Sequence, residues 1–460
     1  MQRTLALLAT CATALGLTTL ATPQAEAATG CKVEYTVTSQ WTGGFQAGVK
    51  VTNLGDPVSG WTLRFTLPDA GQKVVQGWNA TWSQSGSAVT ATNVDWNRTL
   101  ATGAATDLGF TGTFTGANAK PTAFTLNGVT CTGSVGGEEP PPGPDPGPGT
   151  PVGINGQLHV CGVNLCNQYN RPVQLRGMST HGIQWFSKCY NSASLDALAK
   201  DWKSDLLRVA MYVQEGGYET DPAGFTSRVN SLVDMAEARG MYAMIDFHTL
   251  TPGDPNYNLD RAKTFFASVA ARNAGKKNVI YEIANEPNGV SWAAVKSYAE
   301  QVIPVIRAAD PDAVIIVGTR GWSSLGVSDG SDETEIINNP VNATNIMYAF
   351  HFYAASHQDN YRAAVSRAAT KLPLFVTEFG TVTYTGGGAV DRASSTAWLD
   401  LLDRLKIGYA NWTYSDANEG SAAFKPGTCN GTDYSSGGVL TESGALLKSR
   451  ISTPDTFPTS

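Results

Sequence analysis

A proline-rich segment divides this sequence into two parts. Residues 138–151 read EEPPPGPDPGPGTP. Proline lacks a backbone N–H and the segment has no large apolar side chain, so it favours an extended spacer rather than a sheet or a core. The chain of 460 residues is also about three times the usual length of one domain. We therefore expect two folded domains, residues 28–134 and 153–460, joined by a linker at 135–152.

The first 27 residues have the layout of a secretory signal peptide. Arg3 supplies a positive charge, residues 5–20 are mostly apolar, and Ala25-Glu26-Ala27 fits the pattern before a cleavage site. An uncleaved membrane anchor is the alternative, but threonines interrupt the stretch and it is shorter than a bilayer span. We expect a mature chain that begins near Ala28, is secreted, and does not associate with a membrane.

The cysteines agree with export to an oxidising compartment. Of the seven cysteines, Cys11 lies in the expected signal peptide, and an even number remains. Zinc binding is the rival interpretation, but no two cysteines are spaced C-x-x-C and the five histidines are scattered. We therefore expect disulfides, no metal and no cofactor. Among the many possible pairings, position in the chain suggests Cys31 with Cys131, Cys161 with Cys166, and Cys189 with Cys429.

The charge balance excludes one class of partner. The chain has 32 Lys+Arg against 39 Asp+Glu, a net charge of -7, and no run of five like charges. Nothing in it indicates a surface for nucleic acid. The low share of charged residues, 15%, is typical of extracellular proteins that meet neutral polymers. We expect a monomer.

After the linker, apolar runs alternate with helical segments. Five segments have helical periodicity, at 194–203, 226–240, 260–275, 292–309 and 395–406. This alternation predicts an α/β (β/α)8 barrel, in which chemistry is expected where the carboxyl ends of the strands converge. The eight apolar runs are 173–182, 205–212, 241–248, 278–287, 314–322, 345–353, 373–380 and 409–416.

Two glutamates end barrel runs on opposite sides of the expected mouth, Glu286 in the fourth run and Glu378 in the seventh. Carboxyl groups that face each other across a cleft suit glycoside hydrolysis: one protonates the leaving oxygen while the other attacks the anomeric carbon. A separation of about 5 Å predicts retention of configuration and about 6.5–9.5 Å predicts inversion. Arg208, ending the second run, and Tyr353 are expected beside Glu378, which makes Glu378 the nucleophile. The alternative is that either glutamate is only a buried ion-pair partner.

Several motifs make a family resemblance specific. IANEP at 283–287, VTEFG at 376–380, GMSTHGIQWF at 177–186, DFH at 246–248, AFHFYA at 349–354 and NWTYSD at 411–416 resemble glycoside hydrolase family 5, across residues 153–452. The resemblance implies that Glu286 is the acid/base and Glu378 the nucleophile. It implies that Asn285 bonds the sugar 2-hydroxyl and Trp412 forms a stacking floor. The remaining residues implied around the pair are Arg208, His248, His351 and Tyr353.

Further residues at the ends of the runs are candidates for the substrate cleft. The alternative for them is packing at the rim of the barrel. His248 and His351 could be metal ligands, but imidazoles that orient carboxylates explain them without an ion. The sequence departs from the family pattern at Ala417, where relatives often carry a lysine two positions before Glu419. The candidates are His181, Trp185, Tyr212, Trp322, Trp412 and Glu419.

Before the linker, short runs rich in Thr, Val and Phe are separated by Gly, Asn, Asp and Pro, which predicts a β-sandwich of antiparallel strands. Five tryptophans occur there, several in polar contexts that resemble turns. Trp61 is expected in the core. A row of exposed indoles would suit the face of a polysaccharide, since pyranose rings present C–H groups to an aromatic face. We expect such a row to consist of Trp41, Trp78 and Trp96.

This part resembles carbohydrate-binding module family 2 along its full length. The motifs that carry the resemblance are CKVEYTVTSQWTGGF, NLGDPVSGWTL, GWNATW, VDWNRT and FTLNGVTC. The resemblance implies cellulose binding by Trp41, Trp78 and Trp96 and a disulfide between Cys31 and Cys131.

Together these observations predict a secreted, retaining endo-β-1,4-glucanase that acts on cellulose and soluble β-glucans. A β-mannanase or broad β-glucanase of the same family is an alternative. Two hypotheses from a different class of protein also stay open: a non-catalytic cellulose-binding or scaffold protein, and a lectin-like adhesin.

Overall fold

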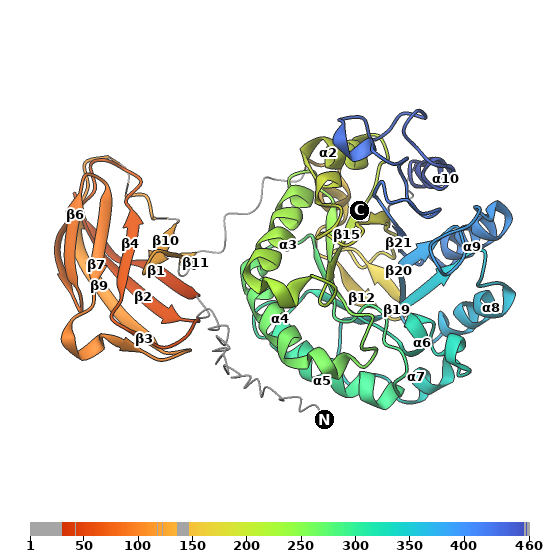
Figure 1. The fold of residues 1–460 in the computed structure, drawn as a ribbon, viewed down its shortest axis with the longest axis horizontal. Helices are drawn as coiled ribbons and strands as arrows, with labels where there is room; N and C mark the ends of the chain where they lie inside the picture. Colours follow the sequence, from red (N-terminus) through yellow and green to blue (C-terminus); the bar gives the residue numbers. More distant parts are fainter. Residues whose placement is uncertain are drawn as a thin grey trace, which may run out of the picture. The chain divides into compact units, whose positions relative to one another are not determined.

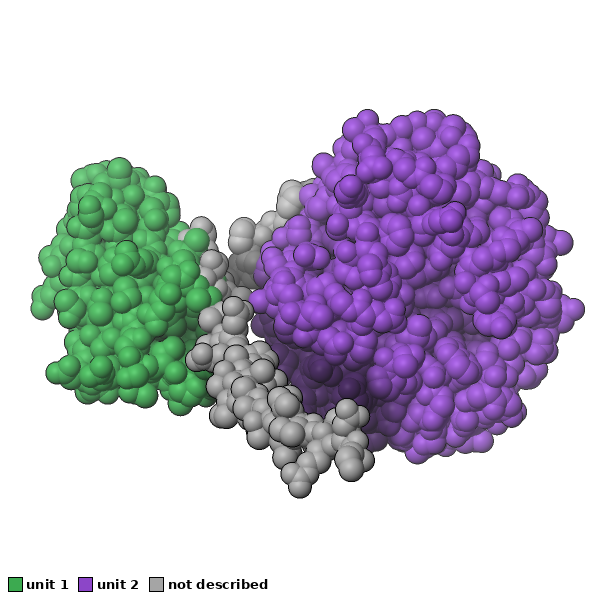
Figure 2. Space-filling view, viewed as in Figure 1, with its two compact units in different colours: residues 1–138 green, residues 139–460 purple. Residues whose placement is uncertain are grey.

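The computed structural model describes residues 30–135 (except 42, 117 and 122), 147–454 and 457. The chain divides into two compact units, residues 1–138 and 139–460 (Figure 2). The expected signal peptide at 1–27, with Cys11, and linker residues 136–146 lie outside the described part. Within that part, no helix has the length and apolar character needed to cross a membrane.

The first unit is a β-sandwich (Figure 1). Its main strands follow the order β5-β9-β2-β1-β11-β10-β4-β7-β6, and β3 pairs only with β8. Aromatic side chains join the two layers: Phe65 lies against Tyr35 and Phe110. The strands are β1 (Cys31–Trp41), β2 (Gly44–Asn53), β3 (Val58–Ser59), β4 (Thr62–Thr66), β5 (Lys73–Trp78), β6 (Thr81–Ser85), β7 (Ala88–Thr92), β8 (Thr99–Leu100), β9 (Ala105–Thr113), β10 (Phe124–Leu126) and β11 (Val129–Val135).

Two details of the sandwich differ from the sequence-based expectation. Antiparallel pairing is expected throughout, but β1 and β11 pair in parallel, because the first and last strands enter the sheet in the same direction. Trp78 lies in β5, which pairs with β9, and Trp82 lies in β6, which pairs with β7, so neither is in a turn. Polar neighbours misled the prediction because one face of these outer strands is solvated.

The second unit is a closed barrel of eight parallel strands, which confirms the predicted (β/α)8 fold (Figure 1). Each of the eight apolar runs supplies one strand. The strands are β14 (Arg176–Ser179), β15 (Leu206–Tyr212), β16 (Tyr242–His248), β17 (Val279–Glu282), β18 (Val314–Val317), β19 (Ile346–Tyr353), β20 (Leu374–Gly380) and β21 (Tyr409–Trp412).

Helices surround the barrel (Figure 1). The five segments with helical periodicity form α2, α3, α4, α5 and α9, and the sequence did not predict α8 or α10. α8 buries only three small apolar residues and its first turn has no side-chain cap, so its pattern is weak. The helices are α1 (Pro151–Asn155), α2 (Ser192–Lys200), α3 (Pro222–Glu237), α4 (Leu259–Asn273), α5 (Trp292–Arg307), α6 (Arg320–Ser323), α7 (Thr334–Asn338), α8 (Asp359–Ala368), α9 (Arg392–Leu405) and α10 (Glu442–Ile451).

The helix α1 begins inside the range that the sequence assigned to the linker. Pro151 occupies its first turn, where a missing N–H costs nothing. The Thr150 side chain accepts a hydrogen bond from Gly153 N. Capping therefore starts the second unit slightly earlier than composition suggested.

The barrel interior changes from apolar to polar along its strands. The half nearer the amino ends of the strands is packed with apolar residues such as Met244, Ile280 and Phe375. Leu158 and Leu165 pack against them from the segment that contains β12 (His159–Cys161) and β13 (Asn164–Cys166). Because side chains alternate along a strand, the residues two and four positions after Met244 share its face. These are Asp246 and His248, so polar side chains collect at the carboxyl ends.

Disulfides join Cys31 to Cys131, Cys161 to Cys166, and Cys189 to Cys429. The last connects the segment after β14 to the segment after β21 and so fastens two loops at the carboxyl end of the barrel.

Replacing Cys31 and Cys131 together by serine should lower the free energy of unfolding of the first unit by about 2–5 kcal/mol. The reason is that this bond closes a loop of sequence separation 100. Denaturant unfolding of the full chain, followed by fluorescence, measures the effect. The matched control replaces Cys161 and Cys166, which lie in the second unit, and should leave the first unit's midpoint unchanged. An unchanged midpoint in the first variant would contradict the expectation.

Candidate active site

The guanidinium group of Arg208 is the centre of the site. Arg208 is 0% exposed. It does not end its strand, as the sequence suggested, but is the third residue of β15 and lies deeper in the barrel. Nε donates to Glu282 Oε2 (2.7 Å), Nη1 to Ser179 Oγ (3.2 Å) and Glu378 Oε2 (3.2 Å), and Nη2 to Asn285 Oδ1 (2.6 Å). Nη2 also forms an ion pair with Asp246 Oδ2 at 3.0 Å.

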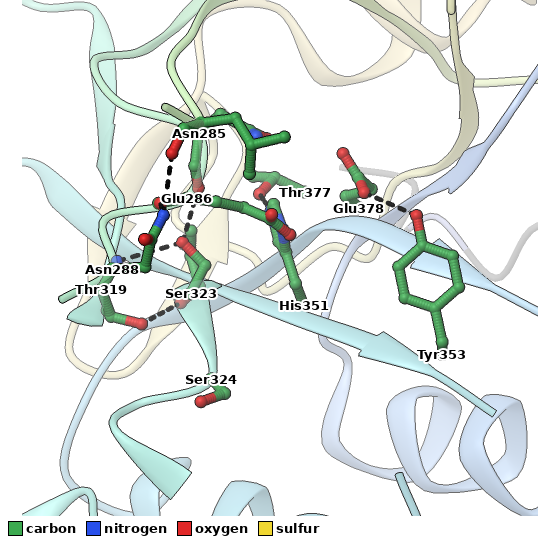
Figure 3. A network of polar contacts seen from close by, with 12 residues as sticks. Asn285, Glu286, Asn288, Thr319, Ser323, Ser324, His351, Tyr353, Thr377 and Glu378 are labelled. Carbon is green, nitrogen blue, oxygen red and sulfur yellow. Dashed lines mark hydrogen bonds and ion pairs between the residues drawn. The ribbon is translucent and has the colours of Figure 1, made fainter. Parts of the chain in front are cut away.

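Both carboxylate oxygens of Glu378, on β20, accept hydrogen bonds. Arg208 donates to Oε2, and the hydroxyl of Tyr353 donates to Oε1 at 2.8 Å (Figure 3). Burial, followed by the charge of Glu378, raises the pKa of Tyr353 well above its usual value, so the phenol remains a donor. The two donors hold the carboxylate in one orientation.

Glu286 lies beyond the end of β17, on a loop rather than on the strand itself. Its backbone N–H donates to Thr249 O (3.1 Å), and its carbonyl accepts from Asn288 Nδ2 (2.9 Å). Ser323 Oγ donates to the carbonyl of Asn285 at 2.6 Å (Figure 3). These bonds fix the loop, so the side chain of Glu286 has a defined position although no strand holds it.

His351, on β19, connects Glu286 to the deeper part of the barrel. Its Nδ1 lies 2.9 Å from Glu286 Oε1, and its Nε2 lies 2.8 Å from Thr377 Oγ1 (Figure 3). Glu282 Oε1 is 3.8 Å from the same Nε2. Burial lowers the pKa of His351, but the nearby carboxylates of Glu282 and Glu286 outweigh burial and raise it to about 9.

The two predicted catalytic carboxyl groups lie close together. One carboxylate oxygen each of Glu286 and Glu378, and a ring nitrogen of His351, all lie within 4.8 Å of one another. Such a group could in principle hold a cation. Here the imidazole uses both nitrogens, and both oxygens of Glu378 have protein donors. Hydrogen bonds therefore account for the cluster.

His248 and Asn285 orient each other. His248 Nδ1 lies 2.6 Å from Asp246 Oδ2, and its Nε2 lies 3.2 Å from Asn285 Nδ2. Burial, together with the charge of Arg208, lowers the pKa of His248 to about 3. The neutral ring therefore accepts from Asn285 Nδ2 while Arg208 donates to Asn285 Oδ1. These two contacts fix which way the amide points.

Aromatic rings form a wall beside the carboxyl pair. Tyr212 stacks on His248 with 4.0 Å between ring centroids, and His248 stacks on Trp412 at 5.5 Å. Trp185 contacts Tyr212 edge-on and is partly exposed, whereas Trp412 is only 6% exposed. Five predicted residues thus belong to one wall, since His181 also lies against Trp412.

Glu419 lies at the end of this wall. Its Oε1 is 4.0 Å from His181 Nε2 and accepts a hydrogen bond from Ser421 Oγ at 2.8 Å. Burial, followed by the neighbouring imidazole of His248, lowers the pKa of His181 to about 3. His181 is therefore neutral, and its approach to Glu419 is not an ion pair at neutral pH.

Trp322 lies next to the loop that carries Glu286. It lies in α6 after β18 with φ 58, a left-handed conformation, and its N–H donates to Pro287 O at 3.0 Å. The ring is partly exposed. None of the ring contacts in the aromatic wall includes Trp322.

Sequence reasoning missed Asp246 and Glu282. Both lie inside apolar runs, at 241–248 and 278–287. A charged residue in an otherwise apolar strand needs a buried partner, and Arg208 was the available cation. That signal could have identified both residues, but no local pattern indicated Ser179, Thr377 or Ser323.

In the first unit, the three tryptophans expected at the surface are exposed by 50% (Trp41), 38% (Trp78) and 71% (Trp96), and Trp61 is buried. Trp41 pairs across strands with Gly44, and Trp78 with Gly109. A Cβ atom added to these glycines would lie 2.3 Å from Trp41 Nε1 and 2.0 Å from Trp78 Cζ2. Both indoles therefore lie flat on the neighbouring backbone.

Comparison with known proteins matches both units. Residues 166–418 match the cellulase family, glycosyl hydrolase family 5, and residues 31–131 match the cellulose binding domain. The chain is 80% identical to endoglucanase CelA of Streptomyces lividans over 100% of both chains. It is 54% identical to endoglucanase E-5 of Thermobifida fusca, covering 95% of this chain and 94% of that one.

A solved structure matches the second unit. The catalytic domain of Thermobifida fusca endoglucanase Cel5A superposes with a TM-score of 0.66 at 62% identity, covering 66% of this chain and 100% of that domain. A variant of that domain, 61% identical to this chain, was solved in complex with cellotetraose. The chain described here is thus a glycoside hydrolase that belongs to glycosyl hydrolase family 5 and carries a cellulose binding domain.

Proposed function

We propose that this protein is a secreted endo-β-1,4-glucanase that cleaves internal bonds of cellulose and soluble β-glucans with retention of configuration. Glu378 is the nucleophile and Glu286 the acid/base. One observation carries the proposal: one carboxylate oxygen of Glu286 and one of Glu378 lie within 4.8 Å of each other. That distance agrees with the short carboxyl spacing of retaining enzymes rather than the wider spacing of inverting ones.

The environments of the two carboxyl groups favour unlike roles. Glu378 accepts hydrogen bonds on both oxygens, so it is poised as an anion to attack the anomeric carbon. Glu286 has one imidazole contact and a partly exposed side chain, so it can give its proton to the leaving oxygen. In the second step Glu286 takes a proton from the water that hydrolyses the glycosyl–Glu378 ester.

The surroundings of the pair favour a glucan. Asn285, oriented by Arg208 and His248, would hydrogen-bond the sugar 2-hydroxyl, an interaction that strengthens in the transition state. His181, Trp185, Tyr212, Trp412 and Glu419 would bind sugars on one side of the scissile bond and Trp322 on the other. The endoglucanase names of the relatives and the cellotetraose complex agree with this choice over a mannanase.

Ala417 is buried at the position where a lysine was expected from the family pattern. Glu419 would therefore contact the sugar with no lysine side chain at position 417.

The first unit would hold the enzyme on crystalline cellulose through Trp41, Trp78 and Trp96. A tether of this kind raises the effective concentration of substrate without changing the active site. A cellulose-binding scaffold or a lectin-like adhesin would need only this unit. The complete set of acceptors around Arg208 argues against both, since binding alone does not require it.

Glu286→Ala should lower the rate of cellulose hydrolysis by about 10²–10⁴-fold. On a dinitrophenyl cellobioside, whose leaving group needs no proton, azide should restore turnover and give the β-glycosyl azide. Azide attacks the glycosyl–enzyme without needing a general base. Glu378→Ala with azide should give the α-glycosyl azide, because azide then occupies the empty nucleophile position. NMR of the products distinguishes these results, and the opposite assignment of anomers would contradict the proposed roles.

Cellohexaose should be cut about 10–100-fold faster than mannohexaose, because the axial 2-hydroxyl of mannose points away from Asn285. Asn285→Ala should reduce this preference along with the rate. Chromatography of the products from both hexaoses, together with the early fall in viscosity of carboxymethylcellulose, gives the measurement. Equal cleavage of the two hexaoses would favour the broad-specificity alternative.

Removing residues 28–146 should leave hydrolysis of soluble carboxymethylcellulose within about twofold of the intact chain, while adsorption to crystalline cellulose falls at least about 10-fold. Thr150 is retained because it caps α1. Replacing Trp41, Trp78 and Trp96 by alanine in the full chain should reproduce the loss of adsorption, and Leu54→Ala, another exposed apolar side chain of this unit, serves as control. Loss of soluble hydrolysis on deletion would favour the adhesin.

A further inference from the structure

We propose that Glu282 is a positioning residue that holds both members of the catalytic pair, one through each of its carboxylate oxygens. Oε2 accepts from Arg208 Nε at 2.7 Å, and Arg208 donates to Glu378. Oε1 faces His351 Nε2 at 3.8 Å, and the other nitrogen of that ring contacts Glu286. The inference rests on the proposed roles of Glu286 and Glu378.

Glu282 acts through its neighbours rather than on the substrate. It is the last residue of β17 and is 0% exposed, so no sugar can reach it. Its oxygen Oε1 has no hydrogen-bond partner among the described residues. A buried carboxylate oxygen without a hydrogen-bond partner is costly unless a positive charge lies nearby. Arg208 supplies a positive charge at Oε2, and His351 is the group that can supply one at Oε1.

The charged groups around Glu282 come from four strands. Arg208 faces it from β15, Asp246 is its register partner on β16, His351 faces it from β19, and Glu378 on β20 shares Arg208 with it. Burial raises the pKa of Glu282, but Arg208 and then His351 outweigh burial and lower it to about 2. Glu282 is therefore an anion at every pH at which the enzyme would work.

The carboxylate of Glu282, on the Nε2 side of the His351 ring, determines which ring nitrogen contacts Glu286. Thr377 Oγ1 at 2.8 Å and Glu282 Oε1 both face Nε2, which keeps a proton on that nitrogen. Nδ1 and Glu286 can then share a single proton: the cationic ring donates to ionised Glu286, and after that proton has moved to Glu286 the neutral ring accepts from it. Glu286 thus keeps its partner in both steps of a retaining reaction, in which it is first an acid and then a base.

The negative charge of Glu282 also weakens the attraction between Arg208 and Glu378. Arg208 carries one positive charge and contacts the carboxylates of Asp246, Glu282 and Glu378. With Glu282 neutral, Arg208 would attract Glu378 more strongly, and a more strongly held carboxylate is a weaker nucleophile. Glu282 therefore affects both chemical steps without occupying the cleft.

The test is Glu282→Gln in the full chain, assayed on soluble carboxymethylcellulose across pH. We expect kcat to fall at least about 10-fold, since an imidazole held in the wrong state impairs proton transfer, with KM within about threefold. Removing one buried negative charge makes each remaining group release its proton more easily. In a plot of kcat against pH, both the acidic and the alkaline limb should therefore move to lower pH, by about 0.5–1.5 units.

Two further variants separate charge from structure. Glu282→Asp keeps the charge but shortens the side chain, so kcat should fall at least about fivefold while the limbs stay at their wild-type pH. Asp310→Asn is the matched control: Asp310 is buried and accepts a hydrogen bond from Tyr281, the residue before Glu282 on β17. It should lower the unfolding temperature without moving either limb.

Thermal unfolding of the second unit, which contains Glu282, reports whether each variant is folded. A folded Glu282→Gln variant with wild-type kcat, or with a reduced kcat and unmoved limbs, overturns the inference. If that variant does not fold, Glu282→Asp decides, and wild-type kcat there overturns the inference. Failure of the proposed function is distinct, because the unaltered chain would then not hydrolyse carboxymethylcellulose or would give the opposite azide anomers.

Discussion

A single buried guanidinium organises the polar half of the barrel. A charge removed from water costs several kcal/mol unless it is paired and hydrogen-bonded, and Arg208 meets this requirement with acceptors on five other residues. Those acceptors come from β14, β16, β17, β20 and the loop after β17. The positions of Asp246, Glu282, Asn285 and Glu378 therefore depend on one another. The apolar half of the barrel supports the arrangement from below, because its packed interior excludes water from the charges.

The proposed catalytic pair, Glu286 and Glu378, is asymmetric in both support and surroundings. Glu378 belongs to a strand and has a donor on each oxygen, whereas Glu286 lies on a loop and shares one imidazole. The loop is held from outside the barrel interior by Ser323, whose hydroxyl binds the carbonyl next to Glu286. Two chemically identical side chains thereby receive different surroundings, which is how one site can provide an anion and a proton donor at the same pH.

The first unit relies on a different physical principle. Its surface tryptophans need area and flatness rather than charge, and Gly44 and Gly109 provide flatness because a side chain there would collide with the indole. Its core is closed by aromatic contacts between the layers and by the Cys31–Cys131 disulfide. Each unit has its own core, so binding to a solid surface and hydrolysis can be altered separately.

Local patterns in the amino-acid sequence were sufficient to predict several features of the fold. The eight apolar runs gave eight barrel strands, composition predicted two units, and the contexts of Trp41, Trp78 and Trp96 against Trp61 predicted which indoles are exposed. Local periodicity records which face a residue occupies but not how deep it lies or what stands opposite. The parallel pairing of β1 with β11, the depth of Arg208 and the position of Glu286 beyond its strand were therefore decided by the tertiary structure. So were the partnerships of Asp246 and Glu282 with Arg208, because they join strands separated along the chain, and only closure of the barrel brings those strands within hydrogen-bonding distance.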